Sequence, residues 1–548
     1  MLLQTNSTRL LPTQIMPSKH YTTITKGKFI LSALSGGLFF ALCFYVMKFG
    51  HLHEDAYILY QYSRSVSHGL GISFDVVNGP AEGATDFLWM TALGLAHRIF
   101  RGYVPIGVIA ALLNSLGIAY IASQILSTRR SVDLNGCALC LLLLFSGGAS
   151  ASVGGFGTVA YGSVYVATIL AFWANKFTRG IVFAMLLALF RPDGFFLGLA
   201  TIISYLTLHK NELNLWRESR KLLLLYVAPL VLYFTWRYSY FGLLLPLPLL
   251  VKQRTDYLLE GLLPNLGSLG IYISIIAGIF LFRNNLDRRL TVLSLSGSLT
   301  LYALLLFAHQ SQNVGYRFQF PLHLAIILLA ASAFPSKKKI THISLFLITF
   351  AASASFLSFG VRSVTHLTND DYINSFPQIL SQRMPLDSIA ITEAGRFPYW
   401  YNKKSSLDLV GLNSKRVVLN GPLAELKRVA PDLVFIHHSG RFIFPESLRG
   451  EGKDNYFTFD PRLVKIKEYQ GMHPVALAPV AALEDAISRS LVGVAVKYGE
   501  RDIEYSHVYF LSKNVDISEF LQALSESFKG KISYLSSEKL SKRYQEIN

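Results

Sequence analysis

The sequence is dominated by long apolar runs from which acidic residues are nearly absent. Between positions 100 and 360 the only acids are Asp133, Asp193, Glu212, Glu218, Asp256, Glu260 and Asp287. Runs of this kind can cross the hydrocarbon of a bilayer as helices, because a helix satisfies its own backbone polar groups. The chain is 51% hydrophobic and only 16% charged, with a mean hydropathy of +0.38. This composition excludes a soluble multi-domain protein and indicates a polytopic membrane protein.

The formal net charge of +17 points to the membrane rather than to nucleic acid. Lysines and arginines gather in short loops between apolar runs, as the positive-inside rule expects, and no basic stripe with interleaved aromatic residues is present. We therefore expect membrane lipids as partners and no nucleic acid. The three cysteines, Cys43, Cys137 and Cys140, all fall inside apolar runs, so no disulfide framework is predicted.

Charge placement also predicts a topology. Residues 1–28 form a cytoplasmic N-terminal segment, 29–49 the first span and 50–103 the first external loop. The apolar run at 86–100 is too short to cross and is expected to lie in the interface, which leaves every basic loop inside. The transmembrane domain, 29–360, then holds about eleven helices with the N-terminus in and the C-terminus out. The spans expected after 104–126 are 134–150, 156–175, 180–190, 195–208, 222–240, 266–282, 290–309, 319–334 and 340–360.

The character of the chain changes after position 360. Residues 361–548 are polar, with β-like runs at 388–392, 433–437 and 507–511 and a helical pattern at 517–528. We expect a soluble α/β domain outside the membrane. The adjacent His437 and His438 have no ligand spacing around them, which favours a structural or surface role over a metal site.

The first external loop carries an unusual concentration of polar chemistry. Glu54 and Asp55 follow two histidines directly after the first span, and Asp86 lies further along the loop. Asp55 is the candidate general base, with Glu54 and Asp86 as alternates, either as a second base or as metal ligands. By residue type alone, helix N-capping is the simpler role for Asp55. The external ends of the apolar runs carry positive charge that could bind a phosphate, and the candidate ligands are Arg191, Lys252 and Arg317. Alternatively, each of these side chains extends to the membrane interface on its own.

Several motifs together resemble a known family. They are His53-Glu54-Asp55-Ala56-Tyr57-Ile58, Arg64, Gly69-Leu70-Gly71, Glu82-Gly83-Ala84-Thr85-Asp86-Phe87-Leu88-Trp89, Arg191-Pro192-Asp193-Gly194 and Tyr316-Arg317-Phe318. This order resembles GT-C glycosyltransferases that use polyprenyl-phosphate sugars. It is similar to the branch containing the mycobacterial terminal arabinofuranosyltransferase and bacterial mannosyltransferase-like enzymes. The resemblance implies a GT-C fold with Asp55 as catalytic base. It also implies that substrate is bound by Arg64, Glu82, Thr85, Asp86, Trp89 and Tyr316.

The expected function is transfer of a sugar from a polyprenyl-phosphate donor to a cell-envelope glycan or glycolipid, such as lipopolysaccharide or a cell-wall polysaccharide. It would occur at the outer face of the bacterial inner membrane. A flippase of lipid-linked sugars and a polysaccharide ligase or polymerase stay open as alternatives. No cofactor and no metal ligands are assigned, and use of a divalent metal, Mg or Mn, is left open.

Overall fold

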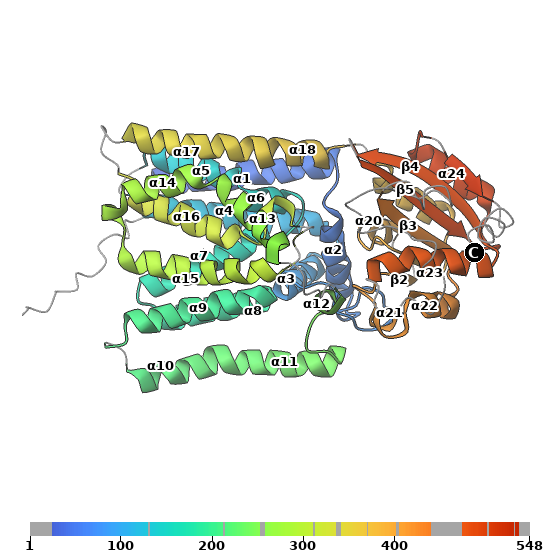
Figure 1. Ribbon diagram of the computed structural model, residues 1–548, viewed down its shortest axis with the longest axis horizontal. Coiled ribbons are helices and arrows are strands. Elements are labelled where there is room, and N and C mark those ends of the chain that lie inside the picture. The colour runs from blue at the N-terminus through green and yellow to red at the C-terminus, as the bar shows by residue number, and fades with distance from the viewer. Residues whose placement is uncertain are drawn as a thin grey trace, which may run out of the picture.

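A computed structural model describes residues 25–129, 132–211, 214–251, 258–308, 310, 313–335, 341–369, 371–401, 405–439, 474–500, 503–530 and 532–535. Helices lie side by side in one half of the molecule, and a β-sheet with its own helices forms the other half (Figure 1). Helix α2 (Glu54–Ser67) runs across the end of the helix bundle, between the bundle and the sheet. The two halves therefore meet on the first loop.

Within the residues that the structure describes, five helices are long and apolar enough to cross a membrane. They are α1 (Lys26–Phe49), α4 (Ile106–Ser127), the stretch Trp216–Phe241, Arg288–Phe307 and His342–Leu367. Two bent helix pairs pass the same test when each pair is taken together, as a broken span or a re-entrant loop would. They are α5 (Leu134–Leu144) with α6 (Gly147–Val153), at 48°, and Gly261–Gly270 with α14 (Ile273–Leu281), at 62°. The shorter apolar helices are α7 (Thr158–Trp173), α8 (Phe177–Phe190), α9 (Pro192–Leu208) and α16 (Phe320–Ala333). The chain is a helical membrane protein, and the number of spans and their orientation stay predictions.

Several of these stretches consist of successive elements. The outermost is α10 (Leu215–Leu222), η1 (Leu223–Val227) and α11 (Ala228–Phe241). Two others are α15 (Arg288–Leu304) with η3 (Leu305–Phe307), and α17 (Thr341–Ser355) with η5 (Phe356–Val361) and α18 (Arg362–Leu367). Shorter pieces are α12 (Leu247–Val251), α13 (Leu258–Gly270), η2 (Arg283–Asn285), η4 (Val314–Tyr316) and η6 (Tyr372–Asn374).

The turn between α8 and α9 places a charged residue at the end of the bundle. Arg191 has extended backbone, and Pro192 follows at the first helical position, where its missing N–H costs nothing. Gly194 lets α9 approach α8 closely, because a Cβ there would lie 2.0 Å from the carbonyl oxygen of Leu187. The Arg191 side chain consequently starts from a rigid helical hairpin.

Two helices occupy the first loop, and the second covers the apolar run at 86–100. Helix α2 packs on α3 (Phe87–Ile99) through Gly94, where a Cβ would lie 2.7 Å from the carbonyl oxygen of Ser63. Beneath α2, the hydroxyl of Tyr60 donates to the carbonyl of Gly155 at 3.1 Å. The start of α2 is thereby held against the turn between α6 and α7.

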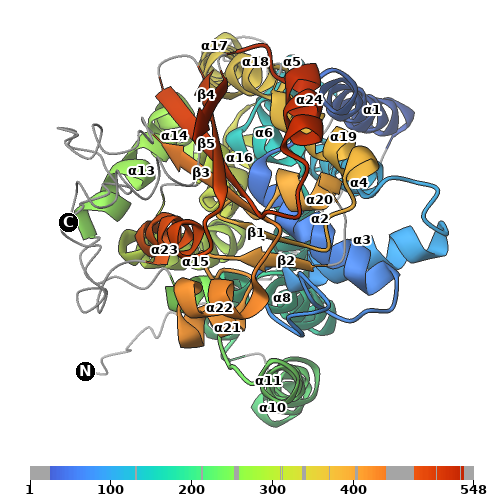
Figure 2. The same cartoon turned by 90° about the vertical axis from the view of Figure 1, so that its right-hand side faces the viewer.

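The sheet has six strands in the order β2-β1-β3-β5-β4-β6, of which β2, β1 and β3 are parallel and the remaining pairs antiparallel. They are β1 (Ser388–Ile391), β2 (Ser405–Asp408), β3 (Leu433–Ser439), β4 (Val492–Glu500), β5 (Ile503–Leu511) and β6 (Ile532–Leu535). One face carries α19 (Phe376–Arg383), α20 (Arg396–Tyr401) and α24 (Ile517–Ser527). The other carries α21 (Lys415–Asn420), α22 (Pro422–Val429) and α23 (Pro474–Ser488) (Figure 2).

The core is divided by the sheet. Successive side chains of a strand point to opposite faces, so Phe435 and Ile436 of β3 belong to different hydrophobic clusters. The cluster containing Phe435 continues through Phe397 and Tyr399 of α20 to Tyr57 of α2 and into the helix bundle. One face of the sheet therefore shares its core with the membrane helices.

Candidate functional site

Glu54 and Asp55 begin helix α2, and their side chains leave it in different directions, as about 100° of rotation per residue requires. Oδ2 of Asp55 lies 3.3 Å from Nη2 of Arg317, at the end of the bundle. Glu54 instead accepts hydrogen bonds from the backbone N–H groups of Gly395 and Arg396, beside the sheet. The Asp55 side chain is 35% exposed, so solvent or a ligand can reach its carboxylate.

Two arginines from distant segments lie against one phenyl ring. The guanidinium carbons of Arg191 and Arg317 are 5.0 and 5.2 Å from the ring centre of Phe318. Arg317 also lies over Phe156 at 3.7 Å, a distance at which a cation is attracted to an aromatic face. Among the described residues, the buried Nη1 of Arg317 and the buried hydroxyl of Tyr161 have no hydrogen-bond partner. An unmet buried donor costs about 1–3 kcal/mol, so this arrangement suits an anionic ligand.

Asp86 closes the other side of the same cluster. Its Oδ1 lies 4.0 Å from Nε of Arg191, which also lies 3.0 Å from Oδ1 of Asp193. The Thr85 hydroxyl donates to Asp86 at 3.3 Å. Burial raises the pKa of Asp86, while the charges of Arg191 and Arg317 act in the opposite direction. We call Asp55, Asp86, Arg191, Arg317 and Phe318 the arginine cluster.

Glu54 belongs to a separate network that joins α2 to the sheet half. Arg396 donates from Nε to Glu54 at 3.1 Å and from Nη1 to the fully buried Asp371. Burial, followed by the charge of Glu393, raises the pKa of Glu54 to about 8. These contacts fix the residue next to Asp55.

Arg64 strengthens the same contact nearly three turns after Glu54 along α2. Its Nη1 donates to the backbone carbonyl of Tyr399 at 2.9 Å, and its guanidinium lies 3.9 Å from the Tyr399 ring centre. Arg64 is thereby placed on α20, where it anchors the helix that carries Asp55.

Glu82 pairs with an arginine of the outermost helix. Its carboxylate accepts from Arg237 of α11, and the two side chains are 4% and 2% exposed. Burial raises the pKa of Glu82 to about 7, although Arg237 acts to lower it. The backbone carbonyl of Glu82 also accepts from the N–H of Leu247 at 3.1 Å. Glu82, which the sequence predicts to bind substrate, thus connects the first loop to α11 and to the chain that follows it.

Two further residues that the sequence predicts to bind substrate, Trp89 and Tyr316, lie next to Arg191 and Arg317 in the chain or in space. Trp89 is buried and stacks on Phe190, the residue before Arg191, with ring centres 6.0 Å apart. Tyr316 has a left-handed backbone (φ 53°), and its ring meets Phe359 edge-on at 5.9 Å. Lys252 lies outside the described residues. Contact of Trp89 or Tyr316 with substrate stays a prediction.

Sequence reasoning missed the aromatic and arginine groups that complete the site. Phe156 and Tyr161 lie in apolar runs, where nothing in the sequence separates them from core residues. Arg396 stands in a motif, Glu393-Ala394-Gly395-Arg396, but no spacing relates it to Glu54, 342 residues earlier. Only the fold brings these segments together.

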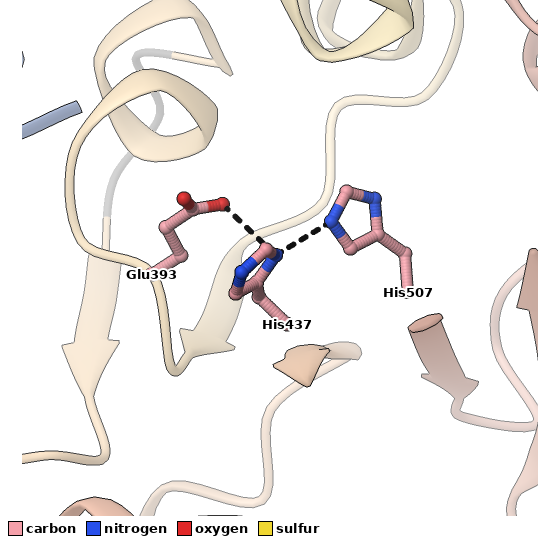
Figure 3. Close-up of side chains that lie close together, drawn as sticks. All are labelled: Glu393, His437 and His507. Carbon is pink, nitrogen blue, oxygen red and sulfur yellow. Dashed lines mark hydrogen bonds and ion pairs between the residues drawn. The ribbon is translucent and has the colours of Figure 1, made fainter. Parts of the chain in front are cut away.

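Four of the five acids of the first loop each face an arginine, whereas Asp75 accepts from Ser405 and from the backbone N–H of Ser406. Glu54, Asp55, Glu82 and Asp86 approach Arg396, Arg317, Arg237 and Arg191 respectively. Within the described ranges, three metal-ligating side chains converge in the sheet half instead: Glu393, His437 and His507 (Figure 3). Binding of Mg or Mn by the acids of the first loop stays a prediction.

The fold and the arginine cluster together define a polytopic helical membrane protein with a site of paired arginines and carboxylates where the bundle meets the sheet half. No protein-family model and no curated protein matches the sequence.

Solved structures of ArnT from Cupriavidus metallidurans share the fold. The one bound to undecaprenyl phosphate superposes with a TM-score of 0.54 at 12% identity, over 76% of this chain and 93% of ArnT. The apo structure gives 0.51 at 11% identity, over 74% and 92%. At such low identity the likeness concerns the fold, because one fold can host different functions.

Proposed function

We propose that the chain is an integral-membrane glycosyltransferase of GT-C type that uses a polyprenyl-phosphate sugar. The observation that carries this proposal is the arginine cluster. A reachable carboxylate, Asp55, lies against Arg317, and Arg191 shares the Phe318 ring with it. Sugar transfer from a lipid phosphate requires a base for the acceptor hydroxyl and positive groups for the leaving phosphate. The cluster offers a carboxylate, two arginines and a buried hydrogen-bond donor without a partner at one end of the helical bundle. ArnT, which shares the fold, binds undecaprenyl phosphate.

In the proposed reaction Asp55 takes the proton of an acceptor hydroxyl while that oxygen attacks the anomeric carbon of the donor. The bond between the anomeric carbon and the phosphate oxygen breaks, and its electron pair leaves with the polyprenyl phosphate. The phosphate gains one negative charge in this step. Arg191 and Arg317 stabilise it, and we place Lys252 with them as a further phosphate ligand.

An apolar groove beside the cluster suits the polyprenyl chain. It has a volume of about 700 Å³ and lies between α9 and the outermost helix. Its wall begins at Phe195, one helical turn after Arg191, so a lipid with its phosphate on Arg191 could lay its chain there. The lining residues are Phe195, Leu199, Leu222, Tyr226, Val227, Leu230, Val231, Phe234, Thr235, Tyr238 and Leu244.

The proposal also assigns compartments and supporting roles. The arginine cluster faces the outer side of the inner membrane, the N-terminus lies in the cytoplasm, and residues 361–548 help to bind a glycan or glycolipid acceptor. Asp55 acts as the base. Glu54, whose carboxylate is occupied by Gly395 and Arg396, positions Asp55.

The test is transfer of labelled sugar from a panel of synthetic polyprenyl-phosphate donors by the full chain in nanodiscs. We expect one donor to be consumed and Asp55→Asn to slow transfer by roughly 10²–10⁴-fold, the usual contribution of a general base. Asp387→Asn, at an exposed acid before β1, is the matched control and should keep wild-type activity.

Two results would overturn the proposal. If no donor is consumed while lipid-linked sugar crosses between leaflets, the chain is a flippase. If only preassembled oligosaccharide is transferred, it is a ligase or polymerase. Unfolding curves of each variant show whether lost activity reflects lost structure.

A further inference from the structure

Three side chains from separate segments meet at one end of the sheet, away from the arginine cluster. His437 of β3 and His507 of β5 are directly paired across the two strands, and Glu393 follows β1, the other neighbour of β3. Figure 3 shows the three side chains converging. Nδ1 of His437 lies 2.7 Å from Nε2 of His507 and 3.7 Å from Oε2 of Glu393.

These positions are fixed by their neighbours. The hydroxyl of Tyr372 lies 2.5 Å from Nδ1 of His507 and 2.8 Å from the hydroxyl of Tyr509. A hydrogen bond on Nδ1 turns Nε2 of His507 toward the other two side chains. Metal-binding histidines usually have such a partner on their second ring nitrogen. The backbone N–H of His437 donates to the Thr392 hydroxyl at 2.8 Å, which holds the residue next to Glu393.

The spacing of the three ligand atoms fits a small divalent cation. Tetrahedral zinc bound at about 2.0–2.1 Å places neighbouring ligand atoms about 3.3 Å apart. Here the two nitrogens are closer than that, at 2.7 Å, and Glu393 is further, at 3.7 Å. These two distances would each have to change by about half an ångström, and all three ligand atoms lie within 4.8 Å of one another. Two imidazoles and one carboxylate form a ligand set that zinc uses, with the fourth position left for water.

We propose that Glu393, His437 and His507 form a zinc-type metal site that holds the segment 393–396 in place. The same segment carries Gly395 and Arg396, whose N–H groups bind Glu54 at the start of α2. The nearby charge of Arg396 is countered by the buried carboxylate of Asp371, so it does not oppose a cation unscreened. The metal would stiffen the contact that positions Asp55, and we assign it no part in sugar transfer.

The site can be tested without an activity assay. Untagged full chain is stripped with a chelator, and Zn²⁺ is titrated while the bound metal is counted. Co²⁺ serves as a spectroscopic probe of tetrahedral N/O coordination. We expect one tightly bound ion, a higher unfolding temperature on adding Zn²⁺, and loss of that ion in His437→Ala and Glu393→Gln.

Two further variants keep the result interpretable in a chain with 14 histidines. His68→Ala, at an exposed histidine that ends α2, should bind the ion as the wild type does. Tyr372→Phe should weaken binding roughly 10–100-fold, because it removes only the orienting hydroxyl. The proposal is overturned if the wild type binds no stoichiometric metal, or if His437→Ala and Glu393→Gln retain the ion. Sugar transfer that persists in the metal-free wild type would leave the proposed function standing by itself.

Discussion

The contact between α2 and the sheet half depends on Arg396, and its removal gives a sharp test. The Arg396 side chain is 11% exposed and pairs with Asp371, whose side chain is 0% exposed, and with Glu54. In Arg396→Met the methionine fills much of the same volume, but Asp371 keeps a buried charge without its cation. Removing one member of a buried ion pair costs about 3–5 kcal/mol. If the sheet half unfolds as a unit of 150–250 residues, its Tm should fall by roughly 6–20 °C.

The chain offers a matched control in a second arginine pair of the same half. Arg383 and Glu526 are also joined by an ion pair, but their side chains are 32% and 41% exposed. Surface pairs contribute about 0–1 kcal/mol, so Arg383→Met should shift the Tm little. Both variants are compared by thermal unfolding of the purified chain, followed by tryptophan fluorescence.

A double variant separates burial of charge from loss of packing. Arg396→Met with Asp371→Asn leaves no unpaired charge at Asp371, so the two substitutions should cost less together than their sum. The reasoning is refuted if Arg396→Met is no more harmful than Arg383→Met, or if the two costs at Arg396 and Asp371 simply add.

Other consequences can be checked on the same preparations. The pKa of Glu54, about 8 in the folded chain against an ordinary 4.5, means that the folded state binds the extra proton between these values. Stability should therefore fall as the pH rises from about 4.5 to about 8, by at most ~1.4 kcal/mol per pH unit, and level off above that; Glu54→Gln should lack that slope in pH-dependent unfolding. Gly155→Ala should destabilise the fold by about 1–3 kcal/mol and slow transfer, because Gly155 has a positive φ and a Cβ there would lie 2.8 Å from Cβ of Ala56. Gly79 also has a positive φ but open space around it, so Gly79→Ala should leave the transfer rate unchanged. Phe156→Leu removes the ring under Arg317 and should weaken donor binding by about 0.5–2 kcal/mol. A titration with lipid phosphate measures this, and an unchanged affinity would contradict the prediction.

Much of the fold follows from patterns that are local in the sequence. Apolar length predicts the bundle, because a buried or lipid-facing helix needs only its own residues to satisfy its backbone. The β-like runs at 388–392, 433–437 and 507–511 coincide with β1, β3 and β5, as hydrophobic periodicity predicts. The cations at positions 191 and 317 could be selected because each stands at the end of an apolar run.

The remainder depends on pairings between distant segments. His437 has no ligand spacing around it in the sequence, yet β3 and β5 pair in a register that sets it opposite His507, 70 residues later. The interpretation of His437 as structural used only nearby residues, and the antiparallel pairing of these strands could not be read from them. Glu54 likewise looks equivalent to Asp55 in the sequence. The 100° step of the helix sends one to the sheet and the other to the bundle.

Because Glu54 and Asp55 point in different directions, helix α2 can present a reachable carboxylate and also be held firmly in place. Asp55 needs a reachable carboxylate, and an exposed side chain cannot hold its own helix in place. Glu54 and Arg64 supply the hold, through α20, while Tyr60 fixes the opposite side on Gly155. A substitution that loosens these contacts should displace Asp55 relative to Arg317 and slow transfer while both residues remain. Loss of activity in Arg64→Met with an intact Asp55 would support this positioning role. Restored activity in Arg64→Lys would show that a hydrogen-bond donor to the Tyr399 carbonyl is enough, without stacking of a guanidinium on the ring.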